Sequence, residues 1–217
     1  FVDQCKLMIY ANLESDLVNK SKTNIVTGNF LNEDVKKPKV DLIVTSPPYV
    51  TSYEYADLHQ LSSLWLEYAS DYRDLREGSI GSLHHDYNFN KEIKRLNITG
   101  GKIVSRLINN KNKSKARSVA KYFLDMQSVA RESFNMLNEN SMALFVIGNT
   151  EYKGVQIDNA KHLCESLIQE GFSEVSVTKR KISKKILTPY RDKKGRFTTD
   201  SKGRKVYNEE FIVVGRK

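Results

Sequence analysis

The clearest pattern in the chain is a mainly apolar run at positions 40–45, where four of the six residues are Val, Leu or Ile. A run of this length without polar alternation is typical of a strand that is covered on both faces in a parallel sheet. The run stops before Pro47 and Pro48, where neither a strand nor a helix continues. The pattern therefore predicts a buried strand and then a rigid loop, at the strand end where α/β sheets bind their ligands.

Most of the remaining chain alternates between helical and strand patterns. Apolar residues recur with the helical period or in short runs, which predicts helices over 2–18, 57–68, 116–137 and 157–170 and strands over 24–27, 142–147 and 211–214. Gly171 is expected to cap the last helix in the left-handed conformation, and Trp65 is expected in the core. This order predicts right-handed crossovers and a parallel α/β sheet with helices on both faces.

The overall composition is that of one compact domain with a surface appendage, because the chain has 217 residues, 39% hydrophobic and 28% charged. No apolar run approaches the roughly 18 to 20 residues of a membrane span, which predicts a cytoplasmic location. Cys5 and Cys164 fall within apolar helical patterns and are expected to be buried thiols, so neither a disulfide nor a metal site is predicted. Because the first residues already follow a helical pattern, we expect Phe1 to lie inside a longer polypeptide.

The net charge of +9 is unevenly distributed along the chain. Residues 86–121 contain ten Lys and Arg against two acidic residues, and residues 179–217 contain fourteen against four, so the rest of the chain is acidic. Two separate basic stretches that also carry aromatic residues favour contacts with nucleic-acid phosphates. A solvated lysine-rich surface and an anionic membrane surface are the alternatives.

The residues that carry chemistry are Thr45-Ser46-Pro47-Pro48-Tyr49, directly after the apolar strand. The two prolines fix the backbone and remove its N–H donors, so the Ser46 hydroxyl and the neighbouring carbonyls form a rigid set of acceptors. Tyr49 supplies a flat face on which a base can stack. Such acceptors can hold an amino group on an aromatic ring and free its lone pair for reaction. The loop has no cysteine for a covalent mechanism.

This pentapeptide resembles the catalytic motif of the amino-group DNA methyltransferases, which is Ser, Asn or Asp followed by Pro-Pro and Tyr or Phe. Its serine form is similar to that of the cytosine-N4 branch. The resemblance covers most of the chain and extends through residues 53–61, 76–81, 145–149 and 210–214. It implies a Rossmann-like methyltransferase sheet, S-adenosylmethionine as the methyl donor, and duplex DNA from which the target base is flipped.

The resemblance also implies roles for individual residues. Ser46 and the Pro47 carbonyl would hold the target amino group, Pro48 would complete the rigid loop, and Tyr49 would stack on the flipped base. The cofactor-binding residues would be Gly28, Asn29, Phe30 and Thr45, although an acidic residue is common in the family where Asn29 stands. The family's glycine-rich cofactor loop, Asp-Pro-Phe-x-Gly-x-Gly, occurs nowhere in the sequence. We therefore expect an incomplete sheet that lacks its first strands, with that loop upstream of Phe1 or on a second polypeptide.

The expected organisation is a partial catalytic core at residues 1–69 and 116–217, an inserted basic and largely helical recognition region at 70–115, and a basic arm at 180–208. The two strands that flank the arm are expected to pair as an antiparallel hairpin at one edge. Candidate DNA contacts are Tyr53, His59, Arg73, Arg76, Arg191, Lys193, Lys194 and Arg196. Weaker candidates beside them are Glu54, Asp57, His84 and His85, for which helix capping or simple surface exposure explains the residue types equally well.

These features predict a DNA methyltransferase of a restriction-modification system, as a fragment or subunit, that acts on the N4 amino group of cytosine. Adenine N6 is the nearest alternative because both amino groups need the same acceptors, and an RNA methyltransferase is less favoured. A non-catalytic DNA-binding subunit, completed by a partner, is an alternative of a different class. An exposed apolar sheet edge or face would mark the place where missing strands dock.

Overall fold

The computed structural model describes residues 2–13, 22–26, 28–32, 37–50, 55–76, 78–83, 87–182, 190–192, 197–200, 202, 204–205 and 209–217. Its centre is a four-stranded sheet in the order β1-β2-β9-β5. The strands are β1 (Val40–Thr45), β2 (Leu137–Ile147), β5 (Glu174–Lys181) and β9 (Glu209–Arg216). β1 and β2 run parallel, whereas β9 is antiparallel to both β2 and β5, so the sheet is mixed rather than wholly parallel. The β5–β9 pair confirms the antiparallel hairpin expected at one edge.

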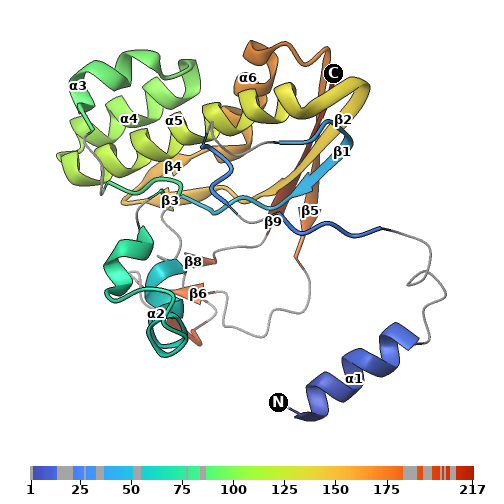
Figure 1. Cartoon of the computed structure of the whole chain (residues 1–217). Helices are drawn as coiled ribbons and strands as arrows, with labels where there is room; N and C mark the ends of the chain where they lie inside the picture. Colours follow the sequence, from blue (N-terminus) through green and yellow to red (C-terminus); the bar gives the residue numbers. More distant parts are fainter. Residues whose placement is uncertain are drawn as a thin grey trace.

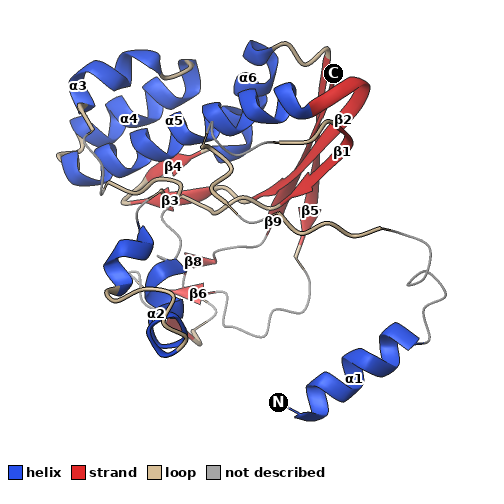
Figure 2. Cartoon of the chain, in the orientation of Figure 1, coloured by secondary structure: helices blue, strands red, loops and turns tan. Residues whose placement is uncertain are grey.

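Three helices cover one face of this sheet (Figures 1 and 2). α5 (Lys113–Met136) and α6 (Asn159–Glu170) pack on the strands, and α4 (Ile98–Asn109) packs on both of these helices. α5 corresponds to the helix predicted over 116–137. α6 begins after Asp158, whose carboxylate accepts a hydrogen bond from the Lys161 backbone at 3.0 Å. It ends at Gly171 in the left-handed conformation with φ of 104°, as predicted.

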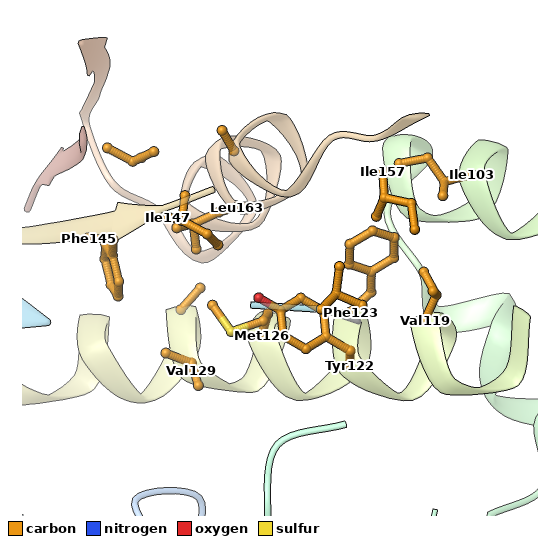
Figure 3. Close-up of a cluster of buried hydrophobic side chains, with 14 of the residues drawn as sticks. Ile103, Val119, Tyr122, Phe123, Met126, Val129, Phe145, Ile147, Ile157 and Leu163 are labelled. Carbon is orange, nitrogen blue, oxygen red and sulfur yellow. The ribbon is translucent and has the colours of Figure 1, made fainter. Parts of the chain in front are cut away.

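The hydrophobic core lies between these helices and the covered face of the sheet. From Ser141 to Ile147, every second residue of β2 points into it, and Phe145 and Ile147 are at most 1% exposed. From the helices, Met126, Phe123 and Leu163 enter the same cluster (Figure 3). The helical period of α5 and the two-residue period of β2 thus meet in one continuous apolar layer.

The opposite face of the sheet is open among the described residues. It carries Leu42 and Val44 of β1, which pair in register with Met142 and Leu144 of β2. Leu42 is 54% exposed and Val44 is 65% exposed, and β1 is an edge strand. The expectation that this strand is covered on both faces is therefore wrong, as is the expectation of helices on both faces of the sheet. An apolar run reports which residues a strand contains but not which elements lie beside it.

The remaining elements are short. β3 (Thr150–Tyr152) and β4 (Val155–Ile157) form a hairpin directly after β2. β6 (Tyr190–Arg191), β7 (Phe197–Thr198) and β8 (Arg204–Lys205) form a small sheet within the basic arm. The other helices are α1 (Val2–Leu13), α2 (Tyr55–Trp65), η1 (Tyr72–Arg76), α3 (Phe89–Glu92) and η2 (Ile93–Arg95).

Three local expectations were wrong. Residues 24–26 form no strand, and Thr27 lies outside the described residues. Trp65 is 87% exposed at the end of α2 rather than in the core. Cys5 and Cys164 are free thiols, but each is only partly buried.

The helical layer includes a segment that sequence patterns assigned elsewhere. α4 falls within residues 70–115, yet its Ile103, Val104 and Leu107 are buried against the core. Its first turn is fixed by Asn97, whose side chain accepts a hydrogen bond from the Gly100 backbone at 2.8 Å. The region at residues 70–115 therefore contributes to the packed core, both through α4 and through Tyr87 and Phe89 before it.

The described residues contain no candidate for a membrane span or a metal site. None of their helices is both long enough and apolar enough to cross a membrane. No three His, Cys, Asp or Glu side chains among them are grouped in a way that would hold a metal ion.

Candidate functional site

The Ser46–Tyr49 segment, which we call the SPPY loop, leaves the sheet at the end of β1. Thr45 pairs with Phe145 of the parallel strand β2, so both strands end at the same edge of the sheet. Pro47 is buried at this edge, and Val50, just after the loop, is 4% exposed. The loop is therefore anchored at the carboxyl ends of parallel strands, where α/β sheets place their ligands.

Ser46 is exposed, and its hydroxyl is oriented by the neighbouring strand. The hydroxyl donates a hydrogen bond to the backbone carbonyl of Val146 at 3.1 Å. Because a hydroxyl has one hydrogen and two lone pairs, this bond uses the hydrogen and leaves the oxygen as an acceptor. Ser46 thus lies at the end of the sheet with its hydroxyl hydrogen bound to β2.

The proline backbone is fixed from the helical layer. Tyr122 of α5 is 3% exposed, and its hydroxyl donates to the Pro48 carbonyl at 2.8 Å. Among the described residues, no donor is bound to the Pro47 carbonyl, which leaves this acceptor beside Ser46. One of the two proline carbonyls therefore holds the loop in place.

Tyr49 is held by contacts with Gly148, Glu210 and Ser46. Its ring lies so close to Gly148, at the end of β2, that a Cβ atom there would be 2.8 Å from the tyrosine Cε2 atom. Its hydroxyl donates a hydrogen bond to Glu210 Oε1 of β9 at 3.1 Å. Burial, and after it the negative charge of Glu210, raises the pKa of Tyr49 to about 12. The phenol therefore stays neutral and remains a hydrogen-bond donor at neutral pH.

Glu210 uses both carboxylate oxygens. Oε1 accepts from Tyr49, and Oε2 is bound by the Arg180 guanidinium on the neighbouring strand β5. Arg180 and Glu210 lie directly opposite each other in the strand register. The SPPY loop is thus connected to the two strands that lead into the basic arm.

The predicted cofactor residues lie in a different turn. The Asn29 side chain accepts from the Leu31 backbone at 2.9 Å and donates to the Gly78 carbonyl at 3.1 Å. Phe30 packs against the edge of the core, with the Lys37 ammonium 5.4 Å from its ring centre. The side-chain amide of Asn29 therefore connects two segments that the sequence analysis singled out separately, residues 28–30 and 76–81.

α5 holds both the segment at residues 76–81 and the SPPY loop. The backbone N–H of Gly81 donates to Asp125 Oδ2 at 2.8 Å, and Asp125 also pairs with Lys121. Asp125 is one helical turn from Tyr122, which holds the SPPY loop. Sequence reasoning missed Tyr122 and Asp125, and the available signal was a charged residue at a core position of an amphipathic helix.

The candidate DNA contacts are only partly described. His59 is exposed on α2, and Arg76 is partly buried at the end of η1. Arg73 and Arg191 are placed in η1 and β6 by their backbone alone. The other candidates, Tyr53, Lys193, Lys194 and Arg196, lie outside the described residues, as do Glu54, His84 and His85.

One relative supports the methyltransferase interpretation. The chain is 27% identical over 159 residues to the Type II methyltransferase M.MvaI of Kocuria varians. The match covers 68% of this chain and 33% of that protein, so the chain spans about a third of the relative's length. The expectation of a methyltransferase of a restriction-modification system fits this relative, and the mixed α/β sheet fits a methyltransferase fold. No family model matches the sequence.

Proposed function

We propose that this chain carries the catalytic loop of an amino-group DNA methyltransferase, which transfers a methyl group from S-adenosylmethionine to N4 of cytosine. The observation that carries the proposal is the SPPY loop itself. Its Ser46 oxygen and Pro47 carbonyl are acceptors at the carboxyl edge of the sheet, and three hydrogen bonds to Val146, Tyr122 and Glu210 fix the loop. The similarity to a Type II methyltransferase supports the same assignment.

The proposed role of the loop is to hold the target amino group. The base leaves the duplex stack because its amino group is otherwise paired, and its ring stacks against Tyr49. Ser46 and the Pro47 carbonyl then accept hydrogen bonds from the two amino hydrogens. These bonds favour a more tetrahedral nitrogen, whose lone pair is no longer delocalised into the ring. Adenine N6 satisfies the same geometry and is the second candidate target.

The described residues do not by themselves fit S-adenosylmethionine. Both functional atoms of the Asn29 side chain are used within the protein, by the Leu31 backbone and by the Gly78 carbonyl. Phe30 is packed against the core, and the sequence has no glycine-rich cofactor loop. We propose that a further segment or a second polypeptide supplies that loop. The exposed edge strand β1, with Leu42 and Val44 on its open face, supports this proposal because unpaired strand edges and apolar faces favour association.

Two basic regions are proposed to hold the duplex on either side of the SPPY loop. The first is the region at residues 70–115, whose net positive charge comes from α4 and the residues after it, and the second is the arm at 180–208. Neutralising Arg191, Lys193, Lys194 and Arg196 together should weaken DNA binding and flatten its salt dependence, because each phosphate contact releases counterions. An unchanged salt slope would remove the arm from the proposal.

The first test is transfer of labelled methyl groups from S-adenosylmethionine to unmethylated DNA, followed by nucleoside mass spectrometry. It compares this chain with the longer protein, or with its partner added. N4-methylcytosine supports the proposal, and N6-methyladenine moves the target while keeping the mechanism. Tight DNA binding without any transfer supports the non-catalytic subunit.

The Ser46→Ala variant tests the role of the loop. Removal of one acceptor should lower single-turnover transfer by about 100-fold to 1,000-fold and leave DNA affinity nearly unchanged. Ser62→Ala, on the outer surface of α2, is a control with the same chemical change. Equal losses of affinity and rate in Ser46→Ala would contradict the proposed role.

A further inference from the structure

Three side chains from distant parts of the sequence form one continuous chain of contacts. Tyr49 donates to Glu210 across 161 sequence positions, and Glu210 pairs with Arg180 across 30. The Glu210 side chain is 17% exposed, whereas that of Arg180 is 56% exposed. This series of contacts thus begins at Tyr49 in the SPPY loop and ends at the solvent-exposed Arg180.

The neighbouring ion pair has a different environment. Lys179 Nζ lies 2.6 Å from Glu209 Oε2, on the same two strands and one residue away. Successive residues of a strand point to opposite faces, so Glu209 and Glu210 face opposite sides of the β5–β9 pair. Of these two carboxylates, Glu210 is the one that contacts Tyr49, and the Glu209 side chain is more exposed, at 39%.

We propose that Glu210 is a positioning residue, which fixes the Tyr49 ring and connects it through Arg180 to the base of the basic arm. The inference rests on the proposed function, because the position of Tyr49 matters only if a base stacks there. A tyrosine ring on a loop rotates about two side-chain bonds, and the contact with Gly148 limits that rotation. The hydrogen bond to Glu210 fixes the far end of the ring.

Arg180 orients the carboxylate in turn. An ion pair between two exposed side chains contributes little to stability, but here one partner is mostly buried and holds a second group. Because β5 ends at Lys181 and β9 begins at Glu209, the arm starts and finishes beside this contact. A displacement of the hairpin at this end therefore moves the carboxylate that holds Tyr49.

The kinetic test uses the complete protein and single-turnover methyl transfer, with DNA affinity measured in parallel. A hydrogen bond to a charged group is worth about one factor of ten or more in rate when it acts only in the reacting complex. Tyr49→Phe and Glu210→Ala are each expected to lower the rate about 10-fold, with DNA affinity changed less than about 2-fold. The double variant should fall no further than either single variant, because both remove the same interaction.

Two further variants separate positioning from general damage. Glu210→Gln retains an acceptor for the phenol and should recover much of the rate. Glu209→Gln makes the same chemical change one residue away, and it should leave the rate within about 2-fold. Wild-type rates in Glu210→Ala, or a double variant that loses the product of the two single effects, would overturn the inference. So would a Glu209→Gln loss equal to that of Glu210→Ala.

A spectroscopic readout does not depend on activity. With 3-fluorotyrosine at position 49, fluorine NMR follows ionisation of this phenol alone. Loss of the Glu210 charge should lower its pKa in Glu210→Gln, and Glu209→Gln should leave it unchanged. If Glu210→Gln lowers the pKa of Tyr49 but the complete protein transfers no methyl group, the proposed function is rejected and the contact between Tyr49 and Glu210 stands. Transfer with identical titrations in all variants would reject the positioning role.

Discussion

The two faces of the central sheet differ in what lies against them. On the covered face, Phe145 and Val213 are 0% exposed beneath α5 and α6, whereas on the open face Val44 is 65% exposed. The same four strands supply both faces, so the difference comes from their neighbours and not from strand composition. The stability of this chain should therefore reside almost wholly on one side of the sheet.

The SPPY loop lies at the boundary between these two faces. Tyr122 holds the loop from the helical layer. Glu210 holds it from the open face, because Glu210 lies three residues before the buried Val213 in β9 and successive strand residues point to opposite faces. One anchor is thus part of a packed core, and the other belongs to a partly solvated ion pair. The rigid side fixes the backbone, and the open side fixes the aromatic ring.

The largest effect is expected on the covered face. Phe145→Ala removes a fully buried ring and should lower the free energy of unfolding by about 3 to 5 kcal/mol. Urea denaturation followed by circular dichroism measures this change. A loss below about 1 kcal/mol would show that the helical layer does not pack on β2 as described.

The covered side was also the part that sequence could predict best. The helix expected over 116–137 lies at Lys113–Met136, and the strand expected over 40–45 has those bounds. Gly171 caps α6 as predicted. These features depend on local periodicity and on the unusual backbone freedom of glycine, both of which can be read from neighbouring residues.

The features that failed depend on distant parts of the chain. The pattern of 40–45 is the same whether an element lies over its second face or not, so the exposure of Leu42 and Val44 was not predictable. The packing of α4 on α5 and α6 was missed because Gly100 and Gly101, and the basic residues in and around this helix, obscured its apolar stripe. The SPPY loop itself was evident from the sequence, but its partners Tyr122 and Glu210 are 74 and 161 positions away.

The second prediction concerns the pH dependence of stability, which tests whether His162 is buried in the helical layer. His162 of α6 is 1% exposed, and its ring stacks on Phe123 with centres 4.0 Å apart. Burial lowers the pKa of His162 to about 3 from 6.5. The unfolded chain binds a proton below about 6.5 while the folded chain does not, so stability falls as the pH falls from about 6.5 toward 3.

The expected loss between pH 7.5 and pH 5 is on the order of 1 to 2 kcal/mol. His162→Gln should weaken the fold at all pH values but remove this part of the pH dependence. Urea midpoints at the two pH values, compared between wild type and variant, give the difference. The same pH dependence in both proteins would show that the imidazole is hydrated or paired in solution.

The smallest effect is expected on the open face, and it is the sharpest test of the comparison. Val44→Thr and Val213→Thr exchange one methyl group for a hydroxyl of similar size on the same sheet. At Val213 the hydroxyl is buried without water, which should cost about 1 to 3 kcal/mol. At Val44 the hydroxyl meets solvent, so the free energy of unfolding should change by less than about 0.5 kcal/mol. Equal losses at the two positions would mean that the open face is already covered in this chain. If the proposed further segment or second polypeptide docks on β1, adding it should bring the cost of Val44→Thr toward that of Val213→Thr. An unchanged small cost would contradict docking on this face.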